Sequence, residues 1–193
     1  MSKPAPLTQH VLVELLSDRV LELLDRGVGT PILLIDGRAG SGKSTLADLL
    51  QQRLFKAGES LPRVLHMDDL YEGWTGLQAG SDYLHRFVLK QLAGGVRANW
   101  QEYDWETGER GRWREFEGGT PLIVEGCGSL SAVNAELSNL RVWLEVPAEV
   151  RHERWIKRDG HKFDEQWPIW AAQEEEFYAR ERSPELADFI GGS

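Results

Sequence analysis

One segment of the chain matches the pattern G-x-x-x-x-G-K-[ST] at every fixed position, and it reads Gly37-Arg38-Ala39-Gly40-Ser41-Gly42-Lys43-Ser44. The apolar run Ile32–Ile35 precedes it and leucines at helical spacing follow it. The segment therefore lies between a predicted buried strand and a predicted helix. Its glycines allow successive backbone N–H groups to point inward and form a cradle for an anion. The segment predicts a strand–loop–helix unit that binds phosphate groups.

The polar residues of this loop have expected roles toward a bound nucleotide. Lys43 would reach the β- and γ-phosphates, and the Ser44 hydroxyl would ligate Mg²⁺. The predicted helix adds the positive end of its dipole. A chance glycine-rich turn would not require the Lys-Ser-Thr sequence that follows Gly42. We therefore expect ATP and Mg²⁺ here, bound by Gly37, Arg38, Ala39, Gly40, Ser41, Gly42, Lys43, Ser44 and Thr45. No guanine-reading Asn/Thr-Lys-x-Asp motif occurs, which favours ATP over GTP without excluding GTP.

Strand and helix patterns alternate along the chain. The predicted strands are the apolar runs 32–35, 64–67, 122–124 and 142–146. The predicted helices cover about 7–24, 46–54, 83–92, 148–158 and 166–182. A hairpin is expected over about 100–116, with its turn at Thr107–Glu109. Such alternation is typical of an α/β fold with a central, mainly parallel sheet and helices on both faces.

Charge and composition exclude several classes of partner. The chain has 193 residues, 22 Lys and Arg, 31 Asp and Glu, and a formal net charge of −9. Nucleic acids and anionic membranes bind proteins through basic surfaces, so neither is expected as a partner of this acidic chain. The single Cys127 fits a reducing compartment, and no apolar run is long enough to cross a bilayer. We expect one cytoplasmic domain, 1–193, and leave its oligomeric state open.

Acidic residues follow two of the predicted strands. Asp68 and Asp69 follow the strand 64–67, and Glu125 ends the strand 122–124. The carboxyl ends of parallel strands meet at one edge of the sheet, where ligands bind. A carboxylate there can accept the proton of an acceptor hydroxyl or help to hold Mg²⁺. We assign both roles to Asp68 and the metal role to Glu125, while Asp69 could equally well only begin a turn.

Three arginines share one face of a predicted helix. Arg151, Arg154 and Arg158 are spaced by three and four residues. They could steady phosphoryl charge during transfer. The alternative is a solvated helix in which Glu149 and Glu153 are their partners.

The chain resembles the uridine kinase and phosphoribulokinase-like group of P-loop kinases from about Ile32 to Ile190. Apart from the phosphate loop, five segments match this group in order: Asp68–Tyr71, Tyr103–Arg110, Ile123–Gly126, Arg151–Asp159 and Ala187–Ile190. The resemblance implies a three-layer P-loop NTPase fold with an arginine-bearing lid, at about 148–165. It also implies an ATP-dependent kinase that phosphorylates a hydroxyl of a small molecule.

The same resemblance implies roles for individual residues. Lys43, Asp68 and Arg158 would be catalytic, and Arg154 would contact ATP. The expected acceptor contacts are Tyr71, Tyr103, Arg110, Glu125 and Arg151. The chain departs from the nucleoside-specific kinases in lacking a His-Pro pair over 74–82 and in having Gly108 where the hairpin of those kinases has His. The acceptor is therefore nucleoside-like or another metabolite, such as a vitamin or sugar derivative. A nucleotide-dependent ATPase or switch that acts through a protein partner is the alternative from another class.

The chain has eight tryptophans, an unusually high number. Trp143, inside an apolar strand, is expected in the core. Trp155, Trp167 and Trp170 are expected to pack between helices. Trp74 and Trp105 either pack at the rim or line the acceptor pocket. The five histidines show no spacing typical of zinc ligands.

Overall fold

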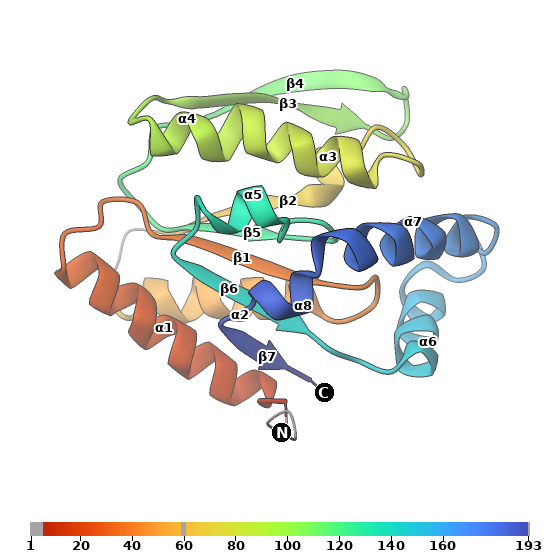
Figure 1. The fold of residues 1–193 in the computed structure, drawn as a ribbon, viewed down its shortest axis with the longest axis horizontal. Helices are drawn as coiled ribbons and strands as arrows, with labels where there is room; N and C mark the ends of the chain where they lie inside the picture. Colours follow the sequence, from red (N-terminus) through yellow and green to blue (C-terminus); the bar gives the residue numbers. More distant parts are fainter. Residues whose placement is uncertain (1–5, 59–60, 193) are drawn as a thin grey trace.

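The computed structural model describes residues 6–58 and 61–192, and its centre is a parallel sheet (Figure 1). The strand order in the described chain is β2-β5-β1-β6-β7, and every pairing between neighbours is parallel. The strands are β1 (Ile32–Gly37), β2 (Arg63–His66), β5 (Leu122–Glu125), β6 (Leu140–Leu144) and β7 (Phe189–Gly191). The predicted parallel sheet is thus confirmed.

Two apolar layers cover the sheet, one on each face. Side chains alternate along a strand, so Leu33 and Ile35 of β1 enter one core while Leu34 enters the other. The first core includes α1 (Gln9–Asp25) and α2 (Lys43–Lys56), which lie below the sheet in Figure 1. The second includes α3 (Leu77–Leu84), which lies above the sheet in Figure 1, and α7 (Gln166–Glu181), which lies to its right. This arrangement confirms the three-layer α/β fold.

Several helix boundaries differ from the sequence predictions, and two of them have a clear cause. The helix expected at 83–92 begins six residues earlier, at Leu77, and continues through a π-helical segment (His85–Leu89) into α4 (Lys90–Ala93). Gly80 lies in its first part because a Cβ there would come within 2.6 Å of the Tyr71 ring. The first helix begins at Gln9 because the Thr8 hydroxyl caps it by accepting the N–H of Val11.

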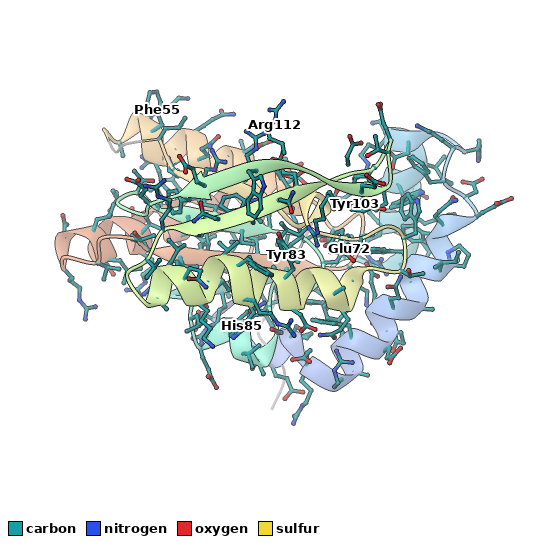
Figure 2. The ribbon with its side chains drawn as sticks, turned by 90° about the horizontal axis from the view of Figure 1, so that it is seen from above. Phe55, Glu72, Tyr83, His85, Tyr103 and Arg112 are labelled. Carbon is teal, nitrogen blue, oxygen red and sulfur yellow. The ribbon has the colours of Figure 1, made fainter. Side chains whose placement is uncertain are left out.

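The predicted hairpin forms from β3 (Ala98–Asp104) and β4 (Glu109–Phe116). It lies beside α3 and α4, and the Tyr83 hydroxyl accepts the backbone N–H of Gln101 at 2.9 Å. Figure 2 shows Arg112 pointing outward from the hairpin, while Tyr83 lies between α3 and the strands. The hairpin is therefore fixed to the body of the protein by its inner face.

The remaining helices are short or lie near the carboxyl ends of the strands. They are α5 (Ala132–Ala135), α6 (Ala148–Asp159) and α8 (Ser183–Leu186). A 3₁₀ turn, Met67–Asp69, directly follows β2. Among the described residues, no helix combines the length and apolar character that a membrane crossing requires.

Trp100 and Trp113, one on each strand of the hairpin, provide a matched test of this packing. Trp100 is 2% exposed and belongs to the core, whereas Trp113 is 64% exposed. We expect Trp100→Ala to lower the free energy of unfolding by about 3–5 kcal/mol, because it removes a large buried ring. Trp113→Ala should change it by no more than about 0.5 kcal/mol. Chemical denaturation of both variants measures the difference, and similar losses in both would contradict this anchoring.

Candidate active site

The loop at the end of β1 has the backbone conformation that phosphate binding requires. Gly40 and Gly42 have φ angles of 78° and 93°, in the left-handed region that favours glycine. A Cβ on Gly40 would come within 2.4 Å of the Arg151 carbonyl oxygen, so no larger residue fits there. A Cβ on Gly42 would meet only Arg154 Nη1, at 3.9 Å. The loop is thus tightly packed at Gly40 and open at Gly42, where α2 begins.

Lys43 is buried beneath this loop. Its Nζ donates to the carbonyl oxygens of Gly37 and Arg38 at 2.9 and 3.2 Å and lies 3.5 Å from Cys127 Sγ. Burial alone would lower the pKa of Lys43, but the neighbouring acidic groups, Cys127 and Glu125 foremost, raise it instead. Lys43 therefore carries its positive charge at neutral pH and is positioned to meet phosphate oxygens.

Ser44, Glu125 and His66 form a hydrogen-bonded chain beside the loop. The Ser44 hydroxyl donates to Glu125 Oε1 at 3.1 Å, and His66 Nδ1 lies 2.6 Å from the same oxygen. This contact with Glu125 raises the pKa of His66. The pairing of β5 with both β1 and β2 brings these three residues together.

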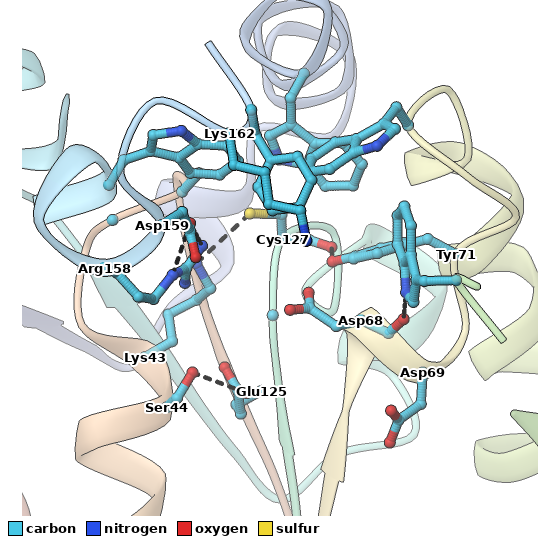
Figure 3. Close-up of a pocket in the computed structure, with 18 of the residues that line it drawn as sticks. Lys43, Ser44, Asp68, Asp69, Tyr71, Glu125, Cys127, Arg158, Asp159 and Lys162 are labelled. Atoms are coloured by element: carbon cyan, nitrogen blue, oxygen red, sulfur yellow. Dashed lines mark hydrogen bonds and ion pairs between the residues drawn. The ribbon is translucent and has the colours of Figure 1, made fainter. Parts of the chain in front are cut away.

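Asp68 lies across one cavity from the loop. The cavity has a volume of about 720 Å³ and is open to solvent on one side. Figure 3 shows Lys43 and Ser44 on one side, Asp68 and Tyr71 on the other, and Cys127 between them. The Asp68 side chain is exposed at this opening. Partial loss of hydration within the cavity, and then the charge of Glu125, nevertheless raise the pKa of Asp68. A carboxyl group with a raised pKa is a better proton acceptor than an ordinary aspartate.

The loop residues expected to bind ATP do not all face the cavity. Ala39, Gly40, Lys43 and Ser44 line it. Arg38 instead pairs with Glu175 of α7 at 2.8 Å, so its side chain points away from the phosphate cradle. Gly37, Ser41, Gly42 and Thr45 shape the loop or the start of α2 without lining the cavity.

The expected acceptor residues divide in the same way. Tyr71 lines the cavity, but its hydroxyl already donates to the Cys127 carbonyl oxygen at 2.7 Å. Tyr103 and Arg110 are outside the lining. Tyr103 packs against Trp105, while Arg110 donates to the carbonyl oxygens of Leu70 and Gln101, both at 3.0 Å. Arg110 thereby supports the segment after β2, and neither residue lines the cavity.

The three arginines of α6 have separate environments. Arg151 donates to the carbonyl oxygens of Val146 and Ala39, both at 3.1 Å, and so supports the phosphate loop from outside. Arg154 lies near Gly42, at the opening of the loop. Only Arg158 lines the cavity, where it pairs with Asp159 at 2.7 Å.

Three residues that the sequence analysis did not single out hold the loop in place. Asp36 is fully buried and accepts the Tyr178 hydroxyl at 2.6 Å. Glu174, one helical turn before Tyr178 on α7, accepts the Ala39 backbone N–H at 2.6 Å. The signal for Asp36 was an acidic residue inside an apolar strand, directly before Gly37. No local pattern marks Glu174 within the acidic run that follows Gln173.

Aromatic side chains form the opposite wall of the cavity. Trp74 is central, because its ring centroid lies within 6.3 Å of four others, those of Trp105, Trp155, Phe163 and Trp170. We call these five residues the aromatic wall; all of them line the cavity. They come from the hairpin, the loop after β2, α6, the segment after it, and α7. Both Trp74 and Trp105 thus take the lining position that the sequence left open.

The residues assigned to Mg²⁺ fit that ion only together with phosphate. In the described chain, no group of three or more His, Cys, Asp or Glu side chains could hold a metal by itself. Mg²⁺ is usually held by one or two carboxylates together with substrate phosphates and water. The oxygens of Ser44 and Glu125, in contact at 3.1 Å beside the loop, suit that requirement.

Strand, glycine loop, buried lysine and parallel sheet together define a P-loop nucleotide-binding domain. The profile of the AAA_18 family, described as an AAA domain, matches residues 33–179, and the chain belongs to this family. No curated protein matches the chain.

Solved structures described as kinases have a similar fold. A possible uridine kinase from Bacillus stearothermophilus has a TM-score of 0.62 and 24% identity, covering 91% of this chain and 98% of its own. A putative fructose transport system kinase from Silicibacter sp. TM1040 has a TM-score of 0.58 and 22% identity, covering 93% and 98%. D-glycerate 3-kinase from Cryptococcus neoformans var. grubii has a TM-score of 0.57 and 12% identity, covering 92% and 90%.

The ionisation of Asp36 provides a test of the buried network behind the loop. Burial raises the pKa of Asp36 to about 6 from an ordinary 3.8, although its hydrogen-bond donors lower it. Because the pKa of Asp36 is raised in the folded state, the stability that the protonated Asp36 contributes is fully present below pH 3.8. This contribution is lost as the pH rises through about 6. Relative to Asp36→Asn, the parent should lose about 3 kcal/mol of unfolding free energy over this range.

Urea denaturation of both proteins at several pH values measures this difference. The Asn variant does not titrate at this position, so it subtracts the contribution of all other groups. If the parent instead gains stability over the variant as the pH rises, the hydrogen-bond donors dominate and the pKa of Asp36 lies below its ordinary value.

Proposed function

We propose that this protein is an ATP-dependent kinase that transfers the γ-phosphate to a hydroxyl of a small molecule. The observation that carries the proposal is one cavity with a phosphate loop on one side and the Asp68 carboxylate on the other. Its volume of about 720 Å³ lies within the range of small-molecule sites, about 300–1,000 Å³. A second substrate beside the phosphates therefore has room.

Binding of the phosphates would rest on the loop and α2. The backbone N–H groups at the start of α2 and the ammonium group of Lys43 would hold the phosphate oxygens, with Arg154 at the opening of the loop. Ser44 and Glu125 would hold Mg²⁺, which would supply positive charge to offset the negative charge of the phosphates. Arg151 would act indirectly, through its hydrogen bond to the Ala39 carbonyl oxygen.

Transfer would require a proton acceptor beside the attacking hydroxyl, and Asp68 has the position and the raised pKa for this role. The hydroxyl oxygen forms the new bond to phosphorus while the bond between phosphorus and ADP breaks, and the hydroxyl proton passes to Asp68. Arg158, whose charge acts on Asp68, is the cavity-lining arginine that could steady the phosphoryl group.

The acceptor belongs to one of two classes of compound. The three similar structures are described as kinases of different compounds, so the shared fold does not select among them. A nucleoside-like acceptor and a vitamin or sugar derivative both remain compatible with the cavity. Tyr71 would contribute its ring to the cavity, and Arg110 would support the segment that carries Asp68. An ATPase that acts through a protein partner would not need this second lined space.

Asp68→Asn separates catalysis from nucleotide binding. Because the amide cannot accept the hydroxyl proton, we expect transfer to fall by about 10²–10⁴-fold while ATP affinity stays nearly unchanged. Lys43→Ala should weaken both. Asp48→Asn, an exposed acid on α2, is the control and should change neither. Nucleotide titration and ADP release with a panel of alcohols measure the two effects.

Two results would contradict these assignments. Parental turnover by Asp68→Asn would remove Asp68 as the proton acceptor. Steady ADP release that no nucleoside or other alcohol stimulates would favour the ATPase alternative over the kinase.

A further inference from the structure

We infer that the acceptor alcohol carries a flat, positively charged ring, which would pack against Trp74 and Trp105 beside the carboxylates of Asp68, Asp69 and Glu106. This inference rests on the proposed function, since it concerns the second substrate of that cavity. It adds a charge and a shape that the kinase assignment alone does not require.

The aromatic wall supplies the shape requirement. Trp74 and Trp105 form an edge-to-face pair with ring centroids 5.1 Å apart. Trp105 is fixed by its own indole N–H, which donates to the Asp68 backbone carbonyl oxygen at 2.8 Å. The pair is therefore held next to the residue proposed to accept the hydroxyl proton. A ligand ring packed on it would lie within reach of Asp68.

The acidic side chains supply the charge requirement. Asp68, Asp69 and Glu106 all line the part of the cavity that the segment after β2 and the hairpin provide. The lining cations come from other elements, namely the phosphate loop (Lys43) and the lid (Arg158 and Lys162). Lys43 donates to loop carbonyl oxygens, and Arg158 is paired with Asp159. An anionic acceptor would thus be repelled where its ring must lie.

Other rings of the wall already hold cations of this chain. The Arg158 guanidinium lies 5.3 Å from the Trp155 ring centroid, and Lys162 Nζ lies 4.9 Å from that of Phe163. Both distances are within the range of attraction between a cation and an aromatic face. No such pair involves Trp74 or Trp105 in the described residues, although both line the cavity. Trp170, the fifth ring of the wall, has no such pair among the described residues either, but it is buried against Tyr71. Trp74 and the exposed Trp105 are therefore the rings that we assign to a cation from a ligand.

Three matched alcohols test the inference, because they differ in charge and little in shape. They are N-methylpyridinium bearing a meta-hydroxymethyl group, meta-methylbenzyl alcohol and meta-hydroxymethylbenzoate. Their binding is measured by calorimetry in the presence of Mg²⁺ and a non-hydrolysable ATP analogue. We expect the pyridinium to bind about tenfold more tightly than the neutral alcohol, and the benzoate to bind most weakly.

Two variants assign the preference to this part of the cavity. Glu106→Gln should reduce the advantage of the pyridinium about threefold, since it removes one carboxylate charge at the hairpin turn. Glu109→Gln, an exposed acid at the start of β4 outside the cavity lining, is the matched control and should leave that advantage unchanged.

The inference is overturned if the pyridinium binds no more tightly than the neutral alcohol or the benzoate. It is also overturned if Glu106→Gln and Glu109→Gln reduce the advantage of the pyridinium equally. The measurement needs no turnover, so it is independent of whether phosphoryl transfer occurs. A kinase that prefers the neutral alcohol would keep the proposed function and lose only this inference. Absence of alcohol-stimulated ADP release would instead contradict the function itself.

Discussion

The buried carboxylate of Asp36 is the constraint on which the phosphate loop depends. Its two oxygens accept four hydrogen bonds, from the backbone N–H groups of Gly37, Gly128 and Leu130 and from the Tyr178 hydroxyl. A buried carboxylate is costly unless such donors surround it. The donors come from the end of β1, the segment after β5 and α7. Satisfying this one group therefore fixes three parts of the chain relative to each other.

Helix α7 extends that constraint to both sides of the cavity. One turn before Tyr178, the buried Glu174 accepts the Ala39 N–H and lies 3.8 Å from the Arg38 guanidinium. One turn earlier still, Trp170 of the aromatic wall packs against Tyr71, with their ring centroids 4.7 Å apart. Residues at i and i+4 share a helix face. The same face of α7 thus holds the phosphate loop and lines the space for a second substrate.

The sequence predicted what local patterns determine. The glycine loop, the apolar strands and the acids at the strand ends follow from the spacing of neighbouring residues, so Lys43, Ser44, Asp68 and Glu125 were found together. Tyr103 and Arg110 were expected at the acceptor but bind or pack against their own chain. The Arg110 contact with Leu70 crosses from the hairpin to the segment after β2, and no sequence spacing encodes that register. Helix α3 begins at Leu77 for a similar reason, because tertiary packing on Tyr71 outweighs the low helix propensity of Gly80.

The tryptophan content follows from the geometry of the cavity. Its wall joins the hairpin, α6, the segment after α6, α7 and the loop after β2. Trp74 contacts rings from all the others because an indole is large enough to bridge them. The same aromatic rings pack between these elements and line the cavity. Packing and recognition therefore depend on the same rings, and a ligand packed against Trp74 would also favour the position of α6 over the phosphate loop.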